Sequence, residues 1–153
     1  VVSNGDPLEI FTTRDGEVIF KKYSLIGGLE DFAAQFCDTL ARSSEFTAVI
    51  TDRDSVIATA GPDKRDLIGR PLTSEMEQLM DGRSIYQRSR GDAALPVCQG
   101  NDHLIAATAA PILCQGDVLG LVLFAAGEGQ YPDESEYKLA QTVSSFLGKH
   151  MES

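Results

Sequence analysis

Hydrophobic positions recur every three or four residues in two long stretches of the chain. The first runs from Gly28 to about Ser43 and the second from Asp133 to Met151. Apolar side chains at this spacing share one face of an α-helix, so each stretch predicts a helix that covers an apolar surface. Asp133 follows a proline and precedes Glu136 by three residues, a pattern typical of the capping box at a helix start.

Alternating apolar and polar residues between these two stretches predict antiparallel strands joined by tight turns. Residues 46–51 and 55–60 form one expected pair around Asp52–Asp54, and residues 103–113 and 118–126 form another. Pro111 cannot donate a hydrogen bond to a neighbouring strand, so it marks a sheet edge or a bulge.

A short helix and a short strand separate the two hairpins. Ser74, with Glu77 three residues on, predicts a helix through Met80 that ends at Asp81–Gly82. Residues 85–87 predict a strand. The whole pattern predicts an α+β fold, an antiparallel sheet with the long N- and C-terminal helices on one face.

The N-terminal segment predicts a separate β-hairpin. Leu8–Thr13 and Glu17–Tyr23 alternate in polarity on either side of Arg14-Asp15-Gly16, and Asp-Gly between two such runs is a strong hairpin signal. An isolated hairpin is marginally stable in water, so its apolar side chains need a partner surface.

The 153 residues carry a net charge of −10, which disfavours autonomous binding to nucleic acid. Six basic and four acidic residues lie between Lys64 and Arg90, which indicates a locally positive face or simply a solvated surface. The longest apolar run, Val118–Ala126, is far shorter than the roughly 20 residues of a membrane helix. We therefore expect no membrane association.

Three cysteines without a Cys-x-x-Cys pair suit a reducing compartment, so we expect a cytoplasmic protein. Cys98, His103 and Cys114 match no zinc spacing, and core packing, redox sensing and metal binding remain open for them, with core packing favoured. His150 suits helix capping or interface packing. We expect no cofactor, no metal site and no catalytic residues.

Two hairpins resemble those of GAF domains. Pro111–Leu113, Gly116-Asp117 and Val118–Leu123 resemble the closing hairpin, and residues 47–59 resemble the opening one. Gly5–Phe11 followed by Arg14–Tyr23 is similar to the second half of an AbrB-type swapped-hairpin DNA-binding domain. The chain therefore resembles AbrB-family sporulation regulators that carry a C-terminal GAF domain, which implies a partial AbrB-like segment over 1–24 and a GAF-like domain over 25–153.

The resemblance implies a non-enzymatic module that senses a signal and forms oligomers for a transcription regulator. In that family the basic residues that contact DNA precede Gly5, and here Val1 to Asn4 precede it, with no basic residue among them. We therefore assign no DNA-contacting residue and expect this chain to bind DNA weakly or not at all.

GAF domains usually hold ligands between the sheet and the central short helices. By position, the resemblance implies a pocket for an unknown small molecule, although the same side chains would also serve as core. The candidate lining residues are Ile57, Thr59, Met76, Met80, Arg83, Tyr86, Arg88 and Thr108.

Terminal helices of GAF proteins commonly pair with a second subunit, so we expect a homo-oligomer, a dimer or a tetramer. The alternative is that the helical stripes cover only the sheet. The expected interface residues are Leu29, Phe32, Phe36, Leu40, Ala140, Val143, Leu147 and Met151.

Two other functions compete with the regulator. Some stand-alone GAF domains are cysteine enzymes that reduce free methionine sulfoxide, and this chain has three cysteines. A PAS- or profilin-like binding module would have the same layers, but the hairpin from Leu8 to Lys22 is foreign to both folds.

Overall fold

The structure is a computed structural model that describes residues 32–62 and 67–152. The described residues belong to one of two units of the chain, Phe32–Ser153. The expected AbrB-like segment 1–24 and Leu29 lie outside the described residues.

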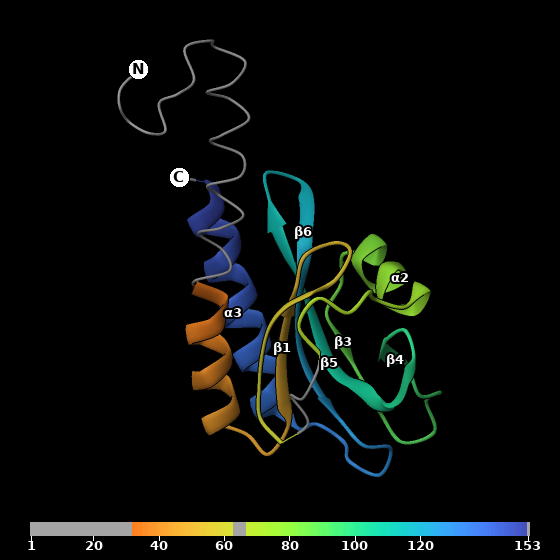
Figure 1. The fold of residues 1–153 in the computed structure, drawn as a ribbon. Helices are drawn as coiled ribbons and strands as arrows, with labels where there is room; N and C mark the ends of the chain where they lie inside the picture. Colours follow the sequence, from red (N-terminus) through yellow and green to blue (C-terminus); the bar gives the residue numbers. More distant parts are fainter. Residues whose placement is uncertain (1–31, 63–66, 153) are drawn as a thin grey trace, which may run out of the picture. The chain divides into compact units, whose positions relative to one another are not determined.

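An antiparallel sheet of six strands forms the centre of this unit (Figure 1). The strands run in the order β2-β1-β6-β5-β3, with β4 also paired to β5. This confirms the expected antiparallel α+β architecture; β4, whose register is irregular, was not expected. The strands are β1 (Thr47–Thr51), β2 (Val56–Ala60), β3 (Tyr86–Gln87), β4 (Pro96–Cys98), β5 (Asn101–Cys114) and β6 (Asp117–Ala126).

Strands β5 and β6 form the longest hairpin, and its turn explains the register. Gln115 and Gly116 both have positive φ, 50° and 88°, as a two-residue turn with matching twist requires. Pro111 lies next to the register shift between Ile112 and Leu113 in β5. Strand β3 pairs with β5 only at Thr108 and Ala109, so this pairing stops before Pro111. The expected bulge or edge position of this proline is therefore confirmed.

Two long helices cover one face of the sheet (Figure 1). Residues 32–42 are helical, and α3 (Glu134–Glu152) packs beside them against β5 and β6. The predicted capping box is present, because the Asp133 backbone N–H donates to Glu136 Oε1 at 2.8 Å. The other carboxylate oxygen of Glu136 accepts a bond from Ser44 Oγ at 3.0 Å, which ties the start of α3 to the chain that follows the first helix.

The short helix α2 (Ser74–Gly82) lies on the opposite side of the sheet (Figure 1). Its N-cap is Thr73, whose side chain accepts from the Met76 N–H, so the expected cap at Ser74 was wrong by one residue. The expected stop at Asp81–Gly82 was also early. Arg83 ends the helix in the left-handed conformation, with φ 58°, and its N–H bonds to the Met80 carbonyl.

Candidate functional site

The α2 residues expected to line a ligand pocket are part of the core. Met76 and Met80 are both 0% exposed and pack with side chains of the sheet such as Val49 and Leu123. Their thioethers fill the space between α2 and the strands, as irregular gaps in cores commonly require. For these two residues the structure favours the core interpretation.

Three other candidates lie apart from α2's buried face. Ile57 and Thr59 are on β2, at the opposite edge of the sheet from β3 and Tyr86. The Thr59 hydroxyl donates to the Ala48 carbonyl at 3.0 Å, so it serves its own hairpin. Arg83 is exposed at the end of α2 and donates to the Gly116 carbonyl in the β5–β6 turn.

Thr108 and Tyr86 face opposite sides of the sheet. Thr108 is paired with Phe124, whereas Tyr86 is paired with Ala109, and successive residues of a strand point to opposite faces. Both hydroxyl oxygens are buried and have no hydrogen-bond partner among the described residues. The eight candidates therefore do not surround one space. The structure brings Met76 and Met80 together in the core cluster against which Tyr86 packs, and Arg88 lies two residues beyond Tyr86 in the chain.

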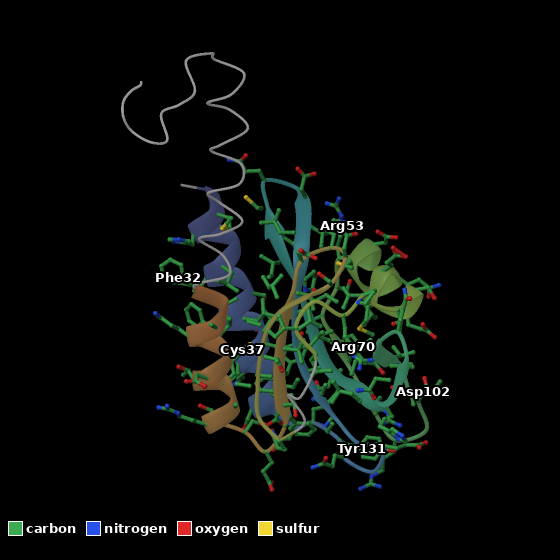
Figure 2. The ribbon with its side chains drawn as sticks, in the orientation of Figure 1. Phe32, Cys37, Arg53, Arg70, Asp102 and Tyr131 are labelled. Carbon is green, nitrogen blue, oxygen red and sulfur yellow. The ribbon has the colours of Figure 1, made fainter. Side chains whose placement is uncertain are left out.

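The surroundings of Arg88 form the most unusual polar environment in the described chain. Arg88 is only 5% exposed, and its Nη1 donates to the Glu128 carbonyl at 3.0 Å. Its guanidinium lies 4.8 Å from the centre of the Tyr131 ring, and that of Arg90 lies 5.0 Å from the same ring. We call Tyr86, Arg88, Arg90 and Tyr131 the arginine–tyrosine cluster; Figure 2 shows Tyr131 at the end of the molecule away from α2.

Charge and burial act together on Tyr86. Burial raises the pKa of its phenol, nearby Asp92 raises it further, and the positive charge of Arg88 acts in the opposite direction. The phenol therefore remains protonated at neutral pH, and its buried hydroxyl is a hydrogen-bond donor without a partner among the described residues.

A separate pocket of about 350 Å³ lies on the α2 side of the sheet. None of the eight expected ligand residues lines it. Arg53, one of its walls, is already engaged with Asp81 at 3.3 Å. The remaining walls are Asp54, Pro71, Leu72, Ser74, Glu77 and Gln99.

Aromatic side chains gather where the two long helices meet. The Phe36 and Phe146 rings are 5.3 Å apart, and the His150 ring lies 4.4 Å from Phe32 and 6.2 Å from Phe146. Phe146 is 49% exposed, and Figure 2 shows Phe32 on the side of its helix away from the strands. We call Phe32, Phe36, Phe146 and His150 the aromatic face.

Four of the eight expected interface residues are buried in the core of this chain. Leu40, Ala140, Val143 and Leu147 are between 0% and 7% exposed, because they form the stripe that covers the sheet. They leave little surface for a partner, whereas Phe32, Phe36 and Met151 are partly exposed. Phe146 was missed because it flanks the main stripe; its four-residue spacing from His150, which was expected in helix capping or interface packing, was the available signal.

The cysteines sit in different environments. Burial raises the pKa of the Cys37 thiol to about 12, and burial also raises the pKa of Cys98. Cys114 is half-buried at the end of β5. Among the described residues, no group of three His, Cys, Asp or Glu side chains is placed to hold a metal ion.

Comparison with known proteins identifies the family. A model of the C-terminal domain of stage V sporulation protein T, described as a transcription factor, matches residues 28–152. The chain belongs to this family. Stage V sporulation protein T of Bacillus subtilis (strain 168) is 38% identical over 151 residues, which span 99% of this chain and 84% of the relative.

Solved structures confirm the GAF-like fold. The phycocyanobilin-bound GAF domain of a cyanobacterial phytochrome superposes with a TM-score of 0.57 at 18% identity, covering 93% of this chain and 96% of that one. The type II free methionine-R-sulfoxide reductase of Thermoplasma acidophilum also gives 0.57, at 10% identity, covering 80% and 94%. In the part of the chain that the structure describes, no helix is long and apolar enough to cross a membrane.

Proposed function

We propose that this chain is the signal-sensing and oligomerising part of a sporulation transcription regulator that acts in the cytoplasm. The aromatic face carries the proposal, because it places an apolar, partly exposed surface on the two helices that frame the GAF-like sheet. Large exposed aromatic groups are costly in water and are enriched where proteins meet.

A second copy of this chain is the partner we propose for the aromatic face. Most homodimers use the same patch on both subunits, so two such helix pairs would meet as a four-helix bundle. His150 stacks on Phe146 and would lie within that contact. The proposed interface keeps Phe32 and Phe36 of the expected one and has Phe146 and His150 in place of its buried residues.

Native mass spectrometry tests this proposal. We expect the wild-type chain to be a dimer or tetramer, and Phe146→Glu to be a monomer with an unchanged circular dichroism spectrum. Ile68→Glu is the matched control, because Ile68 is also apolar and exposed, at 61%, but lies in a loop. A monomeric wild type, or an assembly unaffected by Phe146→Glu, would contradict the proposal.

We also propose that the chain is not an enzyme. Thiol catalysis needs a thiolate, and burial raises the pKa of both Cys37 and Cys98. The likeness to the reductase is one of fold. Incubation with free methionine sulfoxide and a thiol reductant should give no product; turnover that disappears in Cys98→Ser or Cys114→Ser would overturn this conclusion.

A further inference from the structure

The charge of Arg88 is buried without a negative partner. Its side chain is 5% exposed, and arginine does not give up its proton inside proteins. Among the residues that the structure describes, no carboxylate forms an ion pair with it. Its polar side-chain contact is one carbonyl oxygen, and its Nε is buried without any hydrogen bond. A buried charge in this state is costly unless an opposite charge accompanies it.

Two acidic residues of this region, Asp92 and Glu128, form no ion pair with Arg88 among the described residues. Asp92 Oδ2 accepts the Ser89 N–H at 2.9 Å, and Glu128 offers Arg88 its main-chain oxygen. A second guanidinium, that of the exposed Arg90, lies over the same Tyr131 ring as Arg88. Two positive groups thus share one aromatic ring at this edge of an otherwise acidic chain.

We infer that Arg88 and Arg90 bind a small oxyanion, a phosphate or carboxylate group of a metabolite, beside Tyr131. Guanidinium groups present paired N–H donors that match the two oxygens of such a group, and the Nε of Arg88 has no hydrogen-bond partner in the described chain. This inference rests on the sensing role proposed above and gives that role a ligand class.

The position of the cluster links such a ligand to α3. Gln87 Nε2 donates to the Asp133 carbonyl at 3.1 Å, and Arg88 holds the Glu128 carbonyl. Both acceptors lie in the segment that leads from β6 into α3. An oxyanion bound by Arg88 and Arg90 would therefore reinforce the start of the helix that carries Phe146 and His150.

Calorimetry and thermal unfolding with inorganic phosphate test the inference, with sodium chloride holding the ionic strength constant. We expect phosphate to bind wild type saturably and to raise its melting temperature. Arg90→Gln should weaken the affinity about tenfold or more, equivalent to about 1.4 kcal/mol. Arg42→Gln is the matched control, because Arg42 is exposed on the first helix, and it should bind like wild type. The same measurements are repeated with succinate. Tighter binding of succinate than of phosphate would assign the site to carboxylates.

Arg88→Lys tests the guanidinium itself, because lysine keeps the charge but loses the paired donors. We expect this variant to lose phosphate binding. If Arg88→Lys does not fold, Arg90→Gln alone tests the inference. Arg90 is exposed and its side chain contacts the Tyr131 ring, so we expect this variant to fold. Absence of binding to wild type by both anions, or equal binding by wild type and Arg90→Gln, overturns the inference. Oligomer formation in native mass spectra is independent of these results, so the two proposals fail separately.

Discussion

Gly148 in α3 packs directly against the carbonyl oxygen of Leu113 at the end of β5. A Cβ built at Gly148 would overlap that oxygen and approach the Leu113 carbonyl carbon to 3.2 Å. The obstacle is backbone, which cannot rotate out of the way as a side chain can. The helix and the β5–β6 hairpin therefore approach as closely as they do because residue 148 has no side chain.

Gly148→Ala should destabilise the protein by about 1–3 kcal/mol, the usual cost of overpacking. In an unobstructed helix the same change would stabilise by about 1 kcal/mol, so the sign of the effect is diagnostic. Urea unfolding measures the difference. Gly129→Ala is the control, because nothing lies within 4 Å of its added Cβ. A stabilised Gly148→Ala variant would show that α3 does not approach β5 this closely.

The N-cap of α2 offers a comparison between neighbouring residues. Thr73 Oγ1 accepts the Met76 N–H and also donates to the Pro96 carbonyl at 2.7 Å. Thr73→Ala should cost about 1–2 kcal/mol, whereas Ser74→Ala should change the free energy of unfolding by less than about 0.5 kcal/mol. Thermal unfolding of both variants decides between the two caps, and a larger loss for Ser74→Ala would restore the sequence-based assignment.

Glu136 is a buried carboxylate with two recorded partners. It accepts from the Asp133 N–H and from the Ser44 hydroxyl, and it is 7% exposed. Glu136→Ala should cost about 2–3 kcal/mol, because two partly buried hydrogen bonds to a carboxylate are lost. Glu134→Ala, which removes only an exposed pair with Lys138, should cost less than about 1 kcal/mol. Equal losses in chemical denaturation would contradict the assigned role.

The buried thiol of Cys37 should make the protein less stable at alkaline pH. Burial raises its pKa from 9.0 to about 12 in the folded chain, so above pH 9 the unfolded chain releases a proton that the folded chain retains. The unfolding free energy should then fall by up to about 1.4 kcal/mol per pH unit more in wild type than in Cys37→Ala. Denaturation curves below and above pH 9 measure this slope, and parallel slopes for both proteins would refute the prediction.

Local sequence patterns predicted every strand of the described sheet except β4, the long helices and the α3 capping box, because these depend on residues close together in the chain. The N-cap at Thr73 was missed because its second partner, Pro96, comes from a distant strand. The ligand residues were wrongly grouped because β6 inserts between β1 and β5, which sends Thr59 and Tyr86 to opposite edges of the sheet. The hydrophobic periodicity of the sequence predicts strands but does not give their order in the sheet.

The helical stripes posed a different problem. An apolar stripe shows that a helix covers something, but the sheet and a second subunit select the same residue types. Leu147 and Phe146 are adjacent in sequence, yet the first is fully buried and the second half-exposed. Which of the two residues is buried depends on the angle at which the helix packs against the sheet, and tertiary packing sets that angle.

The bond between Ser44 and Glu136 restricts how the two long helices can move. Glu136 sits in the first turn of α3 and Ser44 just after the first helix, so sliding one helix along the other breaks this bond. The close approach of Gly148 to Leu113 restricts sliding of α3 along β5 near the other end of α3. These two contacts therefore favour a joint tilt of both helices over a lengthwise shift of one, and this is the motion that the proposed sensing role would use.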